Sequence, residues 1–157
     1  MTGEEAVRVT GVVPIDRSIF GLDEMRRPGE ERPFWAELPV DGTTPVQVGQ
    51  GIALIFSNAQ THDASVAIDV SPTPLTPGPE FELLGEWRWV TGTGEQILCN
   101  IDGAVLEFRL RPDSQYTLRV WRAGGDTAEA RFRELMGVVF PIDGLEKYHF
   151  GFTLTDR

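Results

Sequence analysis

Apolar and polar residues alternate almost without a break from residue 81 to residue 122. This period of two is typical of strands that bury one face. Similar segments recur along the rest of the chain, and clusters rich in Gly, Pro, Asp and Ser separate them. Strands at such regular spacing are typical of sandwiches and barrels. We therefore expect an all-β fold, an antiparallel two-sheet β-sandwich of jelly-roll-like form with at most one or two short helices.

The strands expected from this pattern follow one another along the chain: residues 7–12, 18–22, 47–57, 64–70, 81–90, 96–101, 106–110, 116–120 and 148–154. Residues 91–94 are interpreted as a hairpin loop, and the Asp-Gly pair at 102–103 is the strongest short hairpin signal. The proline-rich residues 71–80 exclude a helix or a central strand, so we expect an extended connection from one sheet to the other. Asp126 is expected to cap a short helix over residues 127–136.

The apolar side chains of segment 81–90 are expected to share one strand face: Phe81, Leu83, Trp87 and Trp89. A face with four apolar residues is normally buried, so core packing is the first interpretation. The alternative is a stacking platform for a sugar, formed by Trp87 and Trp89 or by Trp35. Trp121 lies on the polar side of its own strand, which makes it a candidate anchor for a partner protein.

The chain is acidic, with a formal net charge of -10 at pH 7, and the excess acid is unevenly distributed. Residues 1–86 carry 14 Asp and Glu against five Arg, whereas residues 87–157 carry ten acids against nine bases. This acidity disfavours binding to nucleic acid, because phosphates would be repelled, and it favours basic partners. The alternative interpretation is a solvated surface of charged loops.

Length and cysteine usage suggest the domain organisation and the compartment. A chain of 157 residues favours one domain, residues 1–157, with a substantial core. The first residues lack the basic and apolar regions of a signal peptide, and the single cysteine, Cys99, fits a reducing compartment. We therefore expect a cytoplasmic protein.

No catalytic, metal-binding or phosphate-binding motif stands out, and we expect no metal and no cofactor. His62-Asp63 is the one adjacent pair of a histidine and an acid, and a histidine in a surface loop is the simpler interpretation. Two histidines and one cysteine do not supply a zinc site without distant carboxylates. Residues 92–95 resemble part of a phosphate-binding loop, but its lysine and its following helix are missing, so a turn is expected.

Two segments, residues 46–70 and 106–122, resemble the competence-associated nuclease inhibitors of the ComJ (Nin) type and related small bacterial immunity-like proteins. The matching positions are mostly apolar and extend the resemblance over residues 15–122: Trp35, Gly51, Phe56, Tyr116, Leu118 and Trp121. The chain departs from the family in the proline-rich segment and in the tail after Gly125. The resemblance implies a small, acidic, non-enzymatic protein that binds and blocks another protein, such as a nuclease.

These observations lead to one main hypothesis and two alternatives. The main hypothesis is an interaction module, an inhibitor or immunity-type protein whose acidic face meets a basic partner. Its candidate partner-binding residues are Asp23, Glu24, Glu30, Glu31 and Asp41, with Trp121 as an anchor. The alternatives are a carbohydrate- or small-ligand-binding sandwich that uses the tryptophans named above, and an enzyme with unrecognised carboxylate chemistry. A sheet edge could also pair with a second copy to form a homodimer.

Overall fold

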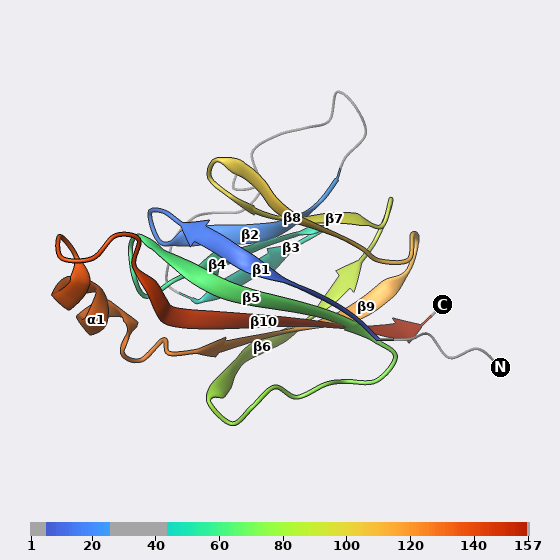
Figure 1. The fold of residues 1–157 in the computed structure, drawn as a ribbon. Helices are drawn as coiled ribbons and strands as arrows, with labels where there is room; N and C mark the ends of the chain where they lie inside the picture. The colour runs from blue at the N-terminus through green and yellow to red at the C-terminus, as the bar shows by residue number, and fades with distance from the viewer. Residues whose placement is uncertain (1–5, 26–43, 157) are drawn as a thin grey trace.

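The computed structural model describes residues 6–25 and 44–156, and it shows two five-stranded β-sheets packed face to face (Figure 1). The expected all-β, two-sheet sandwich is confirmed. The single helix of the described residues lies at one end of the sandwich, opposite the end at which β10 finishes (Figure 1). No helix in the described ranges is long and apolar enough to span a bilayer.

The first sheet has the strand order β1-β5-β10-β9-β6. Its strands are β1 (Val7–Ile15), β5 (His62–Ser71), β10 (Asp143–Asp156), β9 (Gln115–Ala123) and β6 (Phe81–Val90). Neighbouring strands are antiparallel except β5 and β10, which run parallel. The first sheet is therefore mixed, and its central strand, β10, follows all the others in the sequence.

The second sheet is antiparallel throughout and has the order β3-β4-β2-β7-β8. Its strands are β3 (Val46–Gly49), β4 (Ile52–Phe56), β2 (Ile19–Glu24), β7 (Glu95–Asn100) and β8 (Gly103–Arg109). The single strand expected over residues 47–57 is wrong, because the chain turns back at Gly51, whose φ of 69° suits glycine.

The core between the sheets is rich in aromatic rings. Phe20 of β2 meets Tyr148 of β10 edge to face, with ring centroids 4.9 Å apart. Trp89 of β6 and Phe108 of β8 pack against Phe152 of β10, at 5.8 and 5.5 Å between centroids. Each of these rings is buried. Two of these pairs, Phe20–Tyr148 and Phe108–Phe152, join one sheet to the other, and such ring contacts add to the stabilisation that comes from burying apolar area.

A β-bulge at residues 83–85 interrupts the pairing of β6 with β9. Leu83 therefore lies opposite Trp121, whereas Trp87 lies opposite Leu118. Leu118 is buried in the core, but Leu83 is 46% exposed. The expectation that the four apolar residues of β6 share one face is wrong, because one inserted residue exchanges the two faces of a strand.

Several connections join the two sheets. Residues 91–94 lead from β6 in the first sheet to β7 in the second, so the expected hairpin there is wrong. The hairpin expected at 102–103 is confirmed, because β7 pairs with β8. The proline-rich segment leads from β5 to β6 within the first sheet, and the expectation that it crosses between sheets is also wrong. Turn residues mark where a strand ends but not which sheet comes next.

The expected short helix is confirmed as α1 (Ala128–Leu135). Thr127 rather than Asp126 occupies the N-cap position, and its side chain makes no capping hydrogen bond. The helix ends at Leu135, Met136 is its C-cap residue, and Gly137 follows with a φ of 82°. Such a left-handed glycine is common directly after a helix.

We predict that Gly124→Ala destabilises the fold more than Gly137→Ala. Both glycines have a positive φ, which costs an alanine about 1–2 kcal/mol. A Cβ at position 124 would also lie 2.2 Å from the carbonyl oxygen of Leu145 in β10, whereas a Cβ at position 137 would meet open space. Urea unfolding should therefore show a loss above about 2 kcal/mol for the first variant and about 1 kcal/mol for the second. Equal losses would contradict this account.

Candidate functional site

The structure describes two of the five acids expected to meet a partner, and it gives both an internal position. Asp23 in β2 is only 7% exposed. The neighbouring Glu24 is partly buried and points its carboxylate at another part of the same chain. Glu30, Glu31 and Asp41 lie outside the described residues.

The Glu24 carboxylate explains the glycine-rich segment after β6. It accepts hydrogen bonds from the backbone N–H groups of Gly92, at 2.8 and 3.0 Å, and of Gly94, at 3.0 Å. The Gln96 side chain donates a further bond at 3.1 Å. The glycine-rich loop therefore does bind an anion, but that anion is a side chain of the chain itself. This contact holds residues 91–94, which connect the two sheets, against β2.

Trp121 lies on the outer face of the first sheet. Its neighbours in register are His149 on β10 and Leu83 on β6. The indole is half-buried, and its N–H has no hydrogen-bond partner among the described residues. Nearby, the buried Asp69 carboxylate accepts bonds from Arg8 at 2.7 and 2.8 Å and also contacts His149. Trp121 therefore has a partly exposed ring beside the buried Asp69 and His149.

The three tryptophans of the alternative ligand site are not brought together as a platform. Trp89 is 1% exposed and belongs to the core. Trp87 is half-buried, packs against that core and lines a shallow groove of about 200 Å³ with Tyr116. Trp35 lies outside the described residues. Among the described tryptophans of this set, Trp87 is therefore the one placed to meet a small ligand.

A larger pocket opens at the end of the sandwich that carries α1. This end pocket has a volume of about 610 Å³. Its lining comes from the β1–β2 turn, the β4–β5 loop, the β7–β8 turn, and the helix with the loop that follows it. Ala59, Ala128, Ile142 and Leu145 form a small buried cluster that holds the helix against the sandwich. The pocket therefore has walls from both sheets and from α1.

One wall of the end pocket consists of exposed apolar side chains. Residues 136–140, here called the apolar loop, run from the end of α1 towards β10. Phe140 is 94% exposed and Val138 is 76% exposed, and Met136 and Val139 are also exposed. A contiguous exposed apolar patch on a soluble domain commonly marks a binding surface.

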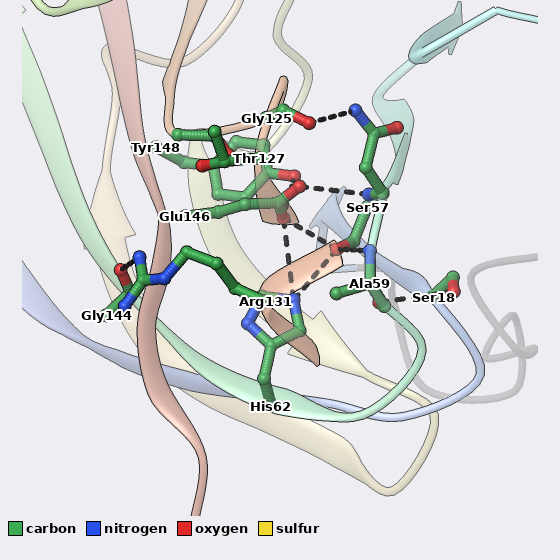
Figure 2. A network of polar contacts seen from close by, with 12 residues as sticks. Ser18, Ser57, Ala59, His62, Gly125, Thr127, Arg131, Gly144, Glu146 and Tyr148 are labelled. Carbon is green, nitrogen blue, oxygen red and sulfur yellow. Dashed lines mark hydrogen bonds and ion pairs between the residues drawn. The ribbon is translucent and has the colours of Figure 1, made fainter. Parts of the chain in front are cut away.

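A buried polar network lies behind the end pocket, centred on the carboxylate of Glu146 (Figure 2). Its Oε1 accepts bonds from the hydroxyls of Ser57, at 2.6 Å, and Tyr148, at 2.7 Å. Its Oε2 accepts the backbone N–H of Asn58 at 2.9 Å. His62 Nε2 lies 2.8 Å from Ser57 Oγ and 3.5 Å from Glu146 Oε1. The network fastens the β4–β5 loop to β10.

The protonation of this network follows from its contacts. Burial alone would raise the pKa of Glu146, but the hydrogen bonds from its four neighbours hold that pKa below the ordinary value. Burial and the nearby Glu146 carboxylate raise the pKa of Tyr148 well above its ordinary value, so the phenol remains a donor. The single hydrogen of Ser57 goes to Glu146, and His62 Nε2 therefore donates to Ser57 Oγ.

The arrangement differs from a Ser-His-acid catalytic triad. In a triad the acid binds one imidazole nitrogen and the serine binds the other. Here Ser57 and Glu146 both contact Nε2 of His62, and Nδ1 has no partner among the described residues. Ser57 donates its hydrogen to the carboxylate and not to the histidine. The contacts of the network join the β4–β5 loop to β10 and do not have the geometry of a triad. No metal-binding cluster of His, Cys, Asp and Glu is found in the described ranges.

The sequence reasoning missed both parts of this site. Residues 136–140 contain three consecutive apolar residues after a helix-ending glycine, a pattern that buried segments also show. Ser57 and Glu146 are 89 positions apart and belong to no motif. The adjacent His62 and Asp63 were noticed, but His62 is buried rather than in a surface loop. An apolar run between a helix and a proline was the one available signal.

The fold and the site together define the class as a two-sheet β-sandwich with a pocket at one end and an exposed apolar loop beside it. Two solved structures share this fold. One is ComJ from Bacillus subtilis, an inhibitor of the DNA-degrading activity of NucA, with a TM-score of 0.57, 13% identity and 98% of each chain covered. The other is the protein of crocagin biosynthetic gene J, with a TM-score of 0.60, 12% identity, and 98% of this chain and all of that chain covered.

No protein-family model and no curated protein sequence matches the chain. The expected resemblance to ComJ is confirmed at the level of the fold.

We predict that Glu146→Gln destabilises the protein at pH 7 by about 1–3 kcal/mol, because an amide replaces a carboxylate that accepts several hydrogen bonds. The folded-state pKa of Glu146 lies below its ordinary value, so its stabilisation is full above about pH 4.5 and is lost as the pH falls through the folded-state pKa. The difference in the free energy of unfolding between wild type and variant should therefore become smaller as the pH falls. Urea unfolding between pH 7 and pH 3 measures it.

The control is Glu134→Gln, an exposed acid on α1. This variant should match the wild type throughout the pH series, since surface changes have small effects. If the difference in unfolding free energy between Glu146→Gln and the wild type stayed constant down to pH 3, it would contradict a lowered pKa for Glu146.

Proposed function

We propose that this chain is a non-enzymatic protein-binding domain that blocks a basic partner, such as a nuclease. The observation that carries this proposal is the apolar loop, in which Phe140 is 94% exposed. An aromatic ring exposed beside a pocket leaves its apolar area in contact with water. This contact is unfavourable, and a partner that covers the ring would remove it. Aromatic residues in such positions are typical anchors of protein interfaces.

Charge and fold support the same proposal. The net charge of -10 favours a basic partner through long-range attraction, and it opposes direct binding to nucleic acid. ComJ, which shares this fold, inhibits a DNA-degrading protein. The Glu146 network, which holds the β4–β5 loop of the end pocket against β10, also fits binding, because a preformed surface spends little free energy on ordering.

We expect Phe140→Ala to weaken partner binding about tenfold without changing stability, because the ring is an exposed anchor. The protein, immobilised, is used to capture partners from its native host at low and high salt. The captured protein is then purified, and its affinity for wild type and variant is measured by calorimetry. Addition of the wild type should also inhibit the activity of a captured nuclease.

The matched control is Leu75→Ala, which removes another exposed apolar side chain in the connection between β5 and β6. We expect this variant to bind like the wild type. Failure to recover any basic protein at low salt would argue against the proposed partner class. Equal weakening by both variants would argue against the apolar loop as the anchor.

A second candidate function is the binding of a carbohydrate or small ligand at the groove beside Trp87. The favouring observation is a half-buried tryptophan next to Tyr116, Glu86 and Arg88, which offers both an apolar ring and hydrogen-bonding groups. If this function holds, the intrinsic fluorescence should change saturably with an oligosaccharide, and Trp87→Phe should remove the change. A spectrum that is unchanged across a glycan panel would contradict it.

A further inference from the structure

We propose that the end pocket accepts a basic side chain of the partner, an arginine or a lysine, together with an adjacent apolar residue. The inference rests on the proposed function and specifies which part of the partner the site recognises. Three features of the pocket carry it: an acidic rim, an apolar wall, and a buried imidazole with one unpartnered nitrogen.

The acidic rim comes from three separate segments. Asp16 lies in the β1–β2 turn, Asp63 at the start of β5, and Asp102 in the β7–β8 turn, and all three line the pocket. Asp16 and Asp102 are exposed and Asp63 is half-exposed. The Asp16 carboxylate accepts a long bond of 3.3 Å from the Thr61 hydroxyl. Within the described part of the chain, no cation forms an ion pair with any of the three.

No lysine or arginine stands among the described residues that line the end pocket. Arg17 adjoins Asp16 in sequence but does not line the pocket. Arg131 on α1 does not line it either, and its guanidinium donates to the carbonyl of Gly144 at 3.1 Å. Three carboxylates without a compensating cation make this end of the sandwich attractive to a positive charge.

The apolar wall suits the rest of a basic side chain. Arginine and lysine carry apolar stems that pack on hydrophobic surface while the charged head meets polar groups. Phe132, Phe140 and Val139 offer such a surface on the helix side of the pocket. The face of an aromatic ring also attracts a cation. A volume of about 610 Å³ lies in the range of ligand pockets and leaves room for a neighbouring apolar residue.

His62 supplies the third feature. Its side chain is 0% exposed and lines the pocket, and Nδ1 has no partner among the described residues. Both contacts drawn for the ring meet one nitrogen, Nε2 (Figure 2). Nε2 donates to Ser57, so in the neutral form of the ring Nδ1 carries no hydrogen and is an acceptor. A guanidinium or ammonium group is a donor that satisfies such an acceptor.

The test uses the full chain, labelled with ¹⁵N, and a blocked dipeptide as the probe. Acetyl-Leu-Arg-amide is titrated while the backbone amide resonances are followed by NMR. We expect saturable shifts at His62, Asp63 and Val139. The matched probe is acetyl-Leu-citrulline-amide, which has nearly the same shape without the charge, and it should bind about tenfold more weakly.

The matched variants test the rim. Asp63→Asn combined with Asp102→Asn should weaken the arginine probe about tenfold, whereas Glu107→Gln, an exposed acid of β8 outside the pocket, should leave its affinity unchanged. Well-dispersed spectra of each variant show that it is folded. Equal binding of the two probes, equal loss in both variants, or no saturable shift up to about 10 mM would overturn the proposal.

This outcome is separable from that of the proposed function. Capture of a basic partner that binds the double Asn variant as well as the wild type would leave the proposed function intact and overturn the pocket assignment. Selective binding of the arginine probe without any captured partner would support the pocket and contradict the proposed function.

Discussion

The buried carboxylate of Glu146 is the contact on which the candidate site depends. Its two oxygens receive bonds from the β4–β5 loop and from Tyr148 on its own strand, and through Ser57 they also fix His62. Asn58 extends the same connection to the segment before α1, through the carbonyl of Gly125. A charge without these partners would be costly to bury, so loop, strand and histidine adopt one arrangement together. The placement of the β4–β5 loop, one wall of the pocket, follows from that cooperative requirement.

The strand content could be read from the sequence because periodicity reports which residues are half-buried. The arrangement of the strands could not. The bulge after Leu83 changes which face of β6 meets the core, and nothing in the local pattern of apolar residues marks an inserted residue. The connection at residues 91–94 and the hairpin at 102–103 both contain glycine, although the first joins two sheets and the second stays within one. Only long-range pairing distinguishes them.

The site was harder to predict than the fold for a related reason. Asp23 and Glu24 contribute to the net charge, yet Asp23 is buried and the Glu24 carboxylate is satisfied by backbone N–H groups. Composition counts such groups as surface charge. The apolar loop is misleading in the opposite way. An apolar run such as the one around Phe140 is typical of buried segments, but here the residues are exposed. The resemblance to ComJ-type inhibitors did identify the fold, since it depended on the spacing of core positions that the sandwich shares.

The position of β10 has a consequence for how the chain is made. This strand lies between β5 and β9, and its partner residues on β5 precede it by 80 to 82 positions. Until the ribosome has released residues 143–156, the nascent first sheet is split into two parts with unpaired edges. A parallel pairing over such a separation is slow to form, because the intervening chain must first be closed into a loop. The emerging polypeptide therefore passes through a stage in which the edges of β5 and β9 are exposed and open to pairing with other chains.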